Sequence, residues 1–390
     1  MQICGIIAEY NPFHLGHAHH IAETRRKMGA EGIMAVMSGS FTQRGAPALT
    51  DKWTRARMAV EGGANLVLEL PFCFACGSAE YFAGGGIRLL AGTGCVQAVS
   101  FGVEGGPVQM PAPESADAKE TLRQALRQGK SYPAAVYAAA KEAGEALPNR
   151  LLALEYLRAV QTYAPALEAC QITRRGAGYH SLGAEGGYLS ATGARALFFQ
   201  GKLKQLREYL PASAARILEQ CYAEGRYAKW ENLSAYALGF LRRGETVLRG
   251  GAYVGEGLEH RFYRAACEAK DLGGLLERVK TKRYPYARLA RILANALVGL
   301  SAEELSRFTQ NGPGYLRVLA ADETGERLLK EMKKHASLPI ITRAGQAKQL
   351  PELSRKMFEL DCRAADIFAL AFENPSFRGG KTDYTRKFTL

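Results

Sequence analysis

Short apolar runs alternate with amphipathic segments through the first hundred residues of the chain. The apolar runs predict β-strands, and the segments between them, where apolar residues recur every three or four positions, predict α-helices. The predicted strands cover residues 3–8, 32–37, 66–70 and 96–101, and the predicted helices cover residues 17–28, 51–62 and 78–90. Strands that alternate with helices at this spacing are typical of a doubly wound parallel sheet, which is a Rossmann-like α/β fold.

The remainder of the chain is dominated by helical periodicity. Helices are predicted at residues 114–128, 133–143, 150–161, 191–199, 323–334 and 350–372, and almost throughout 210–308. Apolar runs predict further strands at 168–173, 315–320 and 338–341. We therefore expect a Rossmann-like domain over residues 1–205, followed by a mainly α-helical domain over residues 206–390.

Composition changes this picture little. Of the 390 residues, 47% are hydrophobic, which is enough for packed cores. No run of about 18 apolar residues is present, so a membrane-spanning helix is not expected. The first ten residues have no basic segment, and Glu9 interrupts their apolar run, so a first strand is expected instead of a signal peptide. A cytoplasmic location is the simplest expectation.

Eight cysteines are scattered along the chain, and one pair has C-x-x-C spacing. Cys73 and Cys76 form that pair, with no second pair and no neighbouring histidine. Zinc sites and redox motifs use such spacing, but usually with additional ligands or a characteristic context. We therefore expect packed thiols here and keep a zinc or redox role as the alternative.

The net charge of +13 indicates an anionic partner, of which nucleic acid is the commonest for a basic protein of this kind. A basic segment in the helical half alternates with two aromatic residues, Tyr284 and Tyr286. Its cations are Lys280, Lys282, Arg283, Arg288 and Arg291. Such a segment suits phosphate contacts combined with base stacking, although a solvated helix face has the same pattern. Residues 379–387 form a second, equally ambiguous basic stretch.

The most informative motif is His14-x-Gly16-His17, which joins the first predicted strand to the first predicted helix. A helix N-terminus presents free N–H groups to a phosphate, and two imidazoles can donate further hydrogen bonds to it. Composition gives about 0.01 expected occurrences of this pattern in the chain, so chance is a poor explanation. Capping histidines, or a zinc site that also uses His19 and His20, are the alternatives.

A second helix start carries Ser190, Thr192 and Arg195, which could hold another part of a triphosphate. Alone, this is an ordinary N-cap with a nearby arginine. The loop at 38–45 and Gly102 follow predicted strands, and the carboxyl ends of parallel strands share one rim. These pieces together predict an ATP site on that rim, with both ends of the triphosphate held.

Residues 5–17 resemble the opening segment of the bacterial tRNA(Met) cytidine acetate ligases. Further matches to that family lie at residues 38–48, 68–71, 100–102, 148–149, 176–180, 190–192 and 283–284. The chain departs from the family at Leu15, where asparagine is usual, and at Val103, where serine is usual. The resemblance spans most of the chain, whereas the two short phosphate motifs alone mark only the wider nucleotidyltransferase superfamily.

The resemblance implies an enzyme that activates acetate with ATP to acetyl-adenylate, releasing pyrophosphate. It then acetylates the exocyclic amine of the wobble cytidine of elongator tRNA(Met), giving N4-acetylcytidine. Expected partners are therefore ATP, acetate and this tRNA, with no DNA or membrane, and the protein would be a monomer or homodimer. Mg²⁺ is expected to neutralise the triphosphate, with no separate protein metal site.

The expected site residues combine the resemblance with the motif analysis. His14, His17 and Arg195 are expected to be catalytic, and the five cations of the basic segment are expected to bind tRNA. Arg174 and Arg175 are adjacent, which leaves the register of the ATP-binding arginine open by one residue; we assign Arg174. The expected ATP-binding residues are Ile7, Ala8, Glu9, Tyr10, Asn11, Pro12, Phe13, His14, Leu15, Gly16, His17, Ala18, His19, His20, Gly102, Asn149, Arg174, Ser190 and Thr192.

Two other functions remain open at the level of sequence. An adenylyltransferase that acts on a phosphorylated metabolite, such as a nicotinamide or pantetheine phosphate, would explain the histidine loop equally well. It would not explain the net charge or the long helical half. A non-catalytic RNA-binding protein would explain the charge, but it would not need two phosphate-binding elements.

Overall fold

The computed structural model describes residues 1–109, 120, 123–124, 127, 148–174 and 187–386. The predicted helices at 114–128 and 133–143 fall almost entirely outside these residues. So do Arg175 and the matching segment at 176–180.

In the described part of the chain, one mixed sheet of seven strands forms the centre, in the order β5-β4-β1-β2-β3-β6-β7. The strands β1 to β5 pair in parallel, as predicted, whereas β6 runs antiparallel to β3 and β7 pairs in parallel with β6. Their bounds are β1 Ile3–Ala8, β2 Gly32–Ser38, β3 Leu66–Leu70, β4 Ala98–Val103, β5 Glu168–Thr173, β6 Leu316–Ala321 and β7 Ile340–Ile341. The chain therefore returns to the sheet from within the half that was predicted to be helical.

Alternate residues of the central strands enter two separate hydrophobic cores. In β2, Met34 and Val36 face one core, whereas Ile33, Ala35 and Met37 face the other. Because both faces of the sheet are covered, the strands read as continuous apolar runs instead of alternating ones. This arrangement confirms the doubly wound α/β fold.

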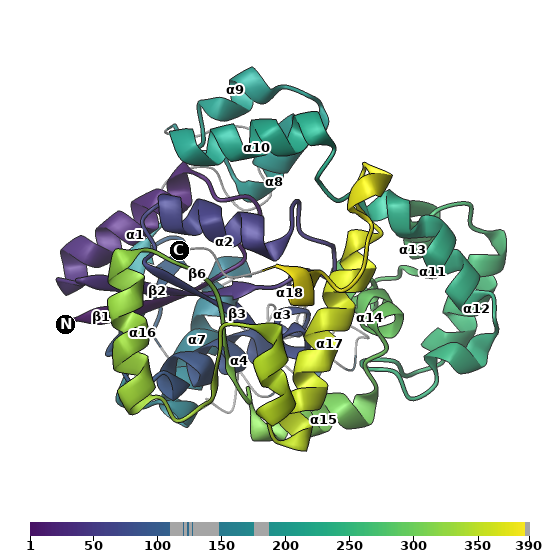
Figure 1. The fold of residues 1–390 in the computed structure, drawn as a ribbon. Helices are drawn as coiled ribbons and strands as arrows, with labels where there is room; N and C mark the ends of the chain where they lie inside the picture. The colour runs from purple at the N-terminus through teal and green to yellow at the C-terminus, as the bar shows by residue number, and fades with distance from the viewer. Residues whose placement is uncertain (110–119, 121–122, 125–126, 128–147, 175–186, 387–390) are drawn as a thin grey trace.

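Helices cover both faces of this sheet. Figure 1 shows α1 (Leu15–Met28) and α2 (Lys52–Glu61) on one side, with α4 (Ala79–Gly92) and α7 (Pro148–Tyr163) on the other. The short α3 (Phe72–Ala75) follows β3, and α16 (Glu323–His335) packs against β2, β3 and β6. Among the described residues, no helix is both long enough and apolar enough to cross a membrane.

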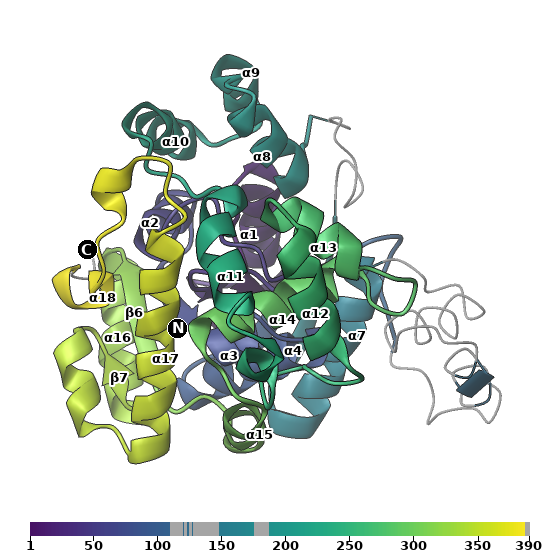
Figure 2. The same cartoon turned by 90° about the vertical axis from the view of Figure 1, so that its right-hand side faces the viewer.

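The remaining helices lie mostly between residues 191 and 385, and the views in Figures 1 and 2 agree that α11, α12 and α13 form a group beside the sheet. The predicted helical run over 210–308 is confirmed as a series of separate helices. The bounds are α8 Ala191–Phe199, α9 Leu203–Arg207, α10 Ala212–Glu224, η1 Trp230–Leu233, α11 Ser234–Leu241, η2 Glu245–Leu248, α12 Leu258–Glu268, α13 Leu272–Val279, α14 Tyr286–Val298, α15 Ala302–Asn311, η3 Ala344–Gln349, α17 Glu352–Ala369, η4 Pro375–Phe377 and α18 Thr382–Thr385.

Two boundaries differ from the prediction in a way that affects the site. Strand β4 begins at Ala98 and ends at Val103, so Gly102 lies within the strand and not in the loop after it. Residues 95–97, directly before Ala98, have no regular secondary structure, and the Gln97 side chain accepts a hydrogen bond from Ile3 N at 2.7 Å. Helix α1 begins at Leu15, because His14 already caps it. The division of the chain near residue 205 stays a prediction, although β6 and β7 extend the sheet beyond it.

Candidate active site

The two histidines of the H-x-G-H motif cap the first turn of α1. His14 is buried and occupies the N-cap, where its Nδ1 accepts a hydrogen bond from Gly16 N at 3.1 Å. His17 Nδ1 accepts one from His14 N at 3.2 Å, which completes a reciprocal capping box. Because each Nδ1 accepts a hydrogen bond, the proton of each neutral ring is assigned to Nε2. Both rings therefore keep one N–H donor for another partner.

Close packing fixes these two rings. Their centroids are 3.7 Å apart with an interplanar angle of 27°, and Tyr10 contacts the His17 ring edge-on at 4.9 Å. A Cβ atom at Gly16 would lie 2.9 Å from His14 Cε1, so a larger residue there would displace the ring. The motif therefore needs glycine at this position for close approach, as its pattern indicates.

The loop between β1 and α1 is held by contacts that the sequence did not indicate. Asn11 Oδ1 accepts a hydrogen bond from Leu49 N at 2.7 Å, and Glu9 Oε1 accepts one from Gln43 N at 2.8 Å. The buried Arg55 donates to Glu9 O at 2.7 Å, and the Asn11–Pro12 peptide bond is cis. A long-range partner such as Arg55 looks like any other helical arginine in the sequence, so no local signal could have identified it.

The second predicted phosphate element lies directly beside this loop. Ser190 caps α8 by accepting a hydrogen bond from Gly193 N at 3.0 Å. Arg195 donates to Asn11 O at 2.7 Å and to Thr192 Oγ1 at 3.3 Å. Asn11 and Arg195, 184 positions apart in the sequence, are thus brought together, as a site that holds both ends of a triphosphate requires.

A second arginine approaches the histidine loop from the sheet. Arg174 directly follows β5, its backbone N donates to Val103 O at 2.8 Å, and its side chain packs against Gly102. Its Nε lies 3.9 Å from Glu104 Oε1. Asn149 is the second residue of α7, and its side chain lies outside the described residues.

The electrostatics of the site favour an anionic ligand. Burial, together with the charges of Arg174 and Arg195, lowers the pKa of His14 to about 3. Burial lowers the pKa of His17 well below its usual range, with the His14 and Arg174 charges adding to the effect. The imidazoles are therefore neutral donors at physiological pH, and the two guanidinium groups carry the positive charge.

These shifts predict that the ligand-free protein loses stability in mild acid. Burial and Arg174 also lower the pKa of His20 to about 4, whereas in the unfolded chain it titrates near 6.5. Below pH 6.5 the unfolded chain therefore binds more protons than the folded protein, so the stabilisation is complete above this pH and declines towards about pH 4. Urea unfolding across this range should show the decline, and His20→Asn should flatten it. An unchanged pH dependence in that variant, or the same flattening in the exposed control His335→Asn, would contradict the assignment.

His20 and its neighbours also bear on the zinc alternative. His20 Nε2 is 2.9 Å from Ser100 Oγ, which ties α1 to β4, and His19 lies beside the Tyr188 ring. Within the described ranges, no group of three or more histidine, cysteine or acidic side chains could hold a metal ion. Cys73 and Cys76 are buried free thiols, and burial raises the pKa of Cys76 to about 12. The burial of these two thiols agrees with the packing interpretation of the C-x-x-C pair.

The predicted RNA-binding cations lie on and before the first turns of α14. Lys280 is paired with Glu277 at 3.2 Å and Arg283 with Glu256 at 2.8 Å, while Arg288 covers the Tyr284 ring at 4.9 Å. The side chain of Lys282 is exposed.

The fifth cation, Arg291, contacts the loop of residues 39–45, which borders the predicted ATP site. It donates to Gln43 O at 3.2 Å, in the loop that also contacts Glu9, and Gly45 packs against its backbone. The basic segment and the histidine loop are thus connected through residues 39–45.

A doubly wound sheet with paired histidines at one helix start and an arginine from a second helix start defines a nucleotide-binding protein of the nucleotidyltransferase class. The sequence pattern of the family described as HIGH Nucleotidyl Transferase matches residues 1–383. The chain therefore belongs to this family.

Individual relatives and solved structures show which proteins of this family the chain is similar to. A tRNA(Met) cytidine acetate ligase of Caldanaerobacter subterraneus is 36% identical over 98% of each chain. The protein of the same name from Acetivibrio thermocellus is 32% identical over the full length of both. Thermotoga maritima TmcAL bound with alpha-thio ATP is 29% identical, covers 100% of both chains and superposes with a TM-score of 0.91. The apo form of that protein gives a TM-score of 0.93.

Proposed function

We propose that this protein is a tRNA(Met) cytidine acetate ligase that works through acetyl-adenylate. The observation that carries the proposal is the contact of Arg195 with the backbone of the histidine loop, which joins two phosphate-binding elements into one site. Full-length relatives with this name, and a structural neighbour bound with alpha-thio ATP, support the same conclusion.

In the first half-reaction, an acetate oxygen attacks the α-phosphorus of ATP, and the bond to pyrophosphate breaks. His14 and His17 donate Nε2–H hydrogen bonds to the charge that develops on the α-phosphate and the leaving group. Ser190, Thr192 and Arg195 hold the β- and γ-phosphates. Mg²⁺ bound with the nucleotide would supply charge neutralisation at the triphosphate.

In the second half-reaction, the exocyclic amine of cytidine attacks the acetyl carbonyl of acetyl-adenylate. The carbon–oxygen bond to AMP breaks, the amine loses a proton, and AMP leaves. A mixed anhydride is reactive enough that positioning the amine supplies most of the acceleration. The contact between Arg291 and the loop 39–45 supports this transfer step, because RNA held by the basic segment would lie next to the proposed ATP site.

The proposal is tested by incubating the protein with ATP, labelled acetate and unmodified tRNA(Met). Label is expected in the tRNA as N4-acetylcytidine, with one pyrophosphate released per acetyl group. AMP transfer to a nicotinamide or pantetheine phosphate, without acetate incorporation, would instead support the adenylyltransferase alternative. Neither product would point to RNA binding without catalysis.

Replacing Arg283 by alanine should weaken tRNA binding about two- to fivefold and lower the slope of log K against log salt by about one. The effect is modest because Glu256 already neutralises part of this charge. Formation of acetyl-adenylate should be unchanged. Filter binding across a salt series measures the first effect, and acetate-dependent ATP–pyrophosphate exchange measures the second.

The matched control for this variant is Arg278→Ala in α13. Arg278 is about as exposed and is also paired, with Glu268 at 3.8 Å, but it lies outside the basic segment. If both variants weakened tRNA binding equally, the effect would come from the overall charge of the protein and not from the position of Arg283. If the Arg283 variant bound tRNA with unchanged affinity, Arg283 would not be part of the tRNA-binding surface.

A further inference from the structure

The loop of residues 39–45 is the point at which three parts of the molecule meet. Gln43 contacts Glu9 through its backbone N–H and Arg291 through its carbonyl. At the other end of the loop, the carbonyl of Gly39 accepts a hydrogen bond from the buried Arg55. The position of this loop therefore affects both the ATP site and the basic segment.

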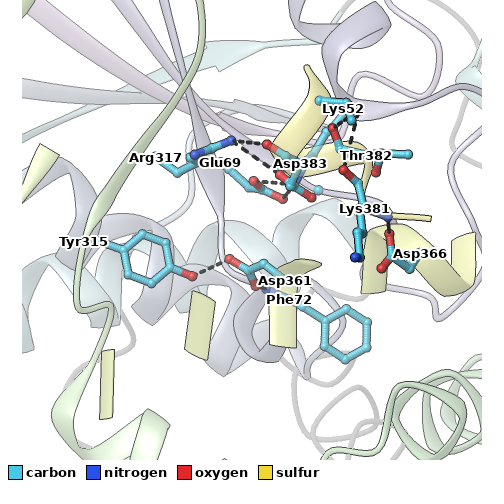
Figure 3. Close-up of polar contacts among 12 residues, drawn as sticks. Lys52, Glu69, Phe72, Tyr315, Arg317, Asp361, Asp366, Lys381, Thr382 and Asp383 are labelled. Carbon is cyan, nitrogen blue, oxygen red and sulfur yellow. Dashed lines mark hydrogen bonds and ion pairs between the residues drawn. The ribbon is translucent and has the colours of Figure 1, made fainter. Parts of the chain in front are cut away.

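A group of buried charges lies directly beneath the start of this loop, and we call it the buried charge cluster. It consists of Lys52 from α2, Glu69 from β3, Arg317 from β6 and Asp383 from α18 (Figure 3). Lys52 Nζ lies 2.7 Å from Glu69 Oε1 and 2.8 Å from Asp383 Oδ1, and Arg317 Nη2 lies 3.5 Å from the same Asp383 oxygen. All four side chains are at most 3% exposed.

Two cations and two carboxylates make the buried charge cluster electrically balanced. Asp383 is the member of the cluster that comes from the basic stretch at 379–387, whose role the sequence left open. Without its carboxylate, Lys52 would lose one of its two ion pairs and Arg317 would lose its ion pair, which leaves the buried charge cluster with one excess positive charge. Such a charge is costly because the interior cannot replace the lost hydration.

The buried charge cluster reaches the loop through Glu69. A Cβ atom at Gly39 would collide with Glu69 Oε1, so the carboxylate lies directly against the loop backbone. Lys52, which holds both oxygens of that carboxylate at 2.7 Å, stands one helical turn before Arg55 in α2. Arg55 in turn donates to the carbonyls of Glu9 and Ser38. One turn of α2 therefore connects Asp383 to the carboxyl ends of β1 and β2.

We infer that Asp383 is a positioning residue for adenylate formation, acting through Lys52 and Glu69 on the loop 39–45. The inference rests on the proposed function, because adenylate formation is the reaction being positioned. Asp383 contacts neither the histidines nor the phosphate elements, so it does not take part in the chemistry. Its carboxylate orients Lys52, Lys52 orients Glu69, and Glu69 supports Gly39 at the base of the rim.

The first experiment compares Asp383→Asn with Asp366→Asn in the full chain. Asp366 accepts a hydrogen bond from Lys381 N at 2.6 Å, so it anchors the same segment without belonging to the buried charge cluster (Figure 3). Acetate-dependent ATP–pyrophosphate exchange is measured per mole of protein that binds an ATP analogue. Asp383→Asn should lower kcat about tenfold, with little change in KM for ATP, because a misplaced rim affects the reacting geometry more than nucleotide binding. Asp366→Asn should retain the starting kcat.

A second variant separates positioning from charge balance. Lys52→Met/Asp383→Asn removes one cation and one anion, so Arg317 and Glu69 remain as a balanced pair and the fold should be more stable than in Asp383→Asn. Positioning predicts that kcat stays low in the double variant, because Lys52, which links Glu69 to α2, has been removed. Recovery of kcat in the double variant, or an unchanged kcat in Asp383→Asn, would overturn the inference. Absence of exchange in the unsubstituted protein would instead count against the proposed function.

Discussion

Replacing His17 by alanine should lower the rate of acetate-dependent pyrophosphate release by at least about a hundredfold, the usual cost of removing one donor to a developing oxyanion. His17 is assigned a neutral ring with Nε2–H as its free donor, because its Nδ1 is occupied by His14 N. Alanine removes both that donor and the reciprocal cap. Single-turnover formation of acetyl-adenylate, measured at saturating ATP, isolates the step.

Two further variants make this result interpretable. Asparagine at position 17 can still accept the hydrogen bond from His14 N, but it lacks the distal donor, so His17→Asn should be nearly as slow as the alanine variant. His260→Ala removes a half-exposed histidine whose Nδ1 pairs with Glu245 at 2.6 Å, and it should leave the rate unchanged. Normal release by His17→Asn would mean that the ring only caps the helix.

Replacing Arg55 by methionine should lower the stability of the folded protein, which is the second large effect that we expect. Its guanidinium is fully buried and donates to four carbonyl oxygens, those of Glu9, Ser38, Gly39 and Thr50. Burial lowers its pKa to about 10, so it remains charged at neutral pH. Methionine fills similar space but leaves these carbonyls without their donor, which should reduce the free energy of unfolding by about 3 kcal/mol.

Chemical denaturation of Arg55→Met and Arg57→Met provides the comparison. Arg57 lies two residues further along α2, is half exposed and pairs with Glu61 one turn away at 2.7 Å. Such a surface pair contributes about 0.5 kcal/mol or less, so its loss should be barely detectable. Equal effects from the two variants would show that the carbonyl contacts of Arg55 are not the source of its contribution.

The parts of the site that could be predicted from sequence are those encoded locally. The histidine motif combines a strand, a close turn and a helix start within fourteen residues, and each of these has its own signature. The same holds for Ser190, whose position at a helix start follows from its side chain and the apolar pattern behind it. The doubly wound sheet was predictable because strands buried on both faces are continuously apolar and are separated by helical periods.

The parts that could not be predicted depend on contacts between residues far apart in the chain. Gly102 was expected after its strand, but it lies inside β4, where the side chain of Arg174, the residue directly after β5, packs against it. Strands β6 and β7 were predicted as strands, yet nothing local indicated that they would extend the N-terminal sheet. Pairing of a strand with a partner about 250 residues away depends on which sheet edge remains open once the rest has packed.

By itself, the sequence determined the alternation of strands and helices, the histidine loop at a strand-to-helix junction, and a family resemblance that its relatives support. Tertiary structure alone decided that Arg195 contacts the histidine loop, that Arg291 reaches the rim, and that Asp383 balances a buried lysine and arginine. The physical reason is that helix caps and apolar periods act within a few residues. A buried charge, in contrast, is stable only beside a specific partner, and that partner is selected by the packing of the whole chain.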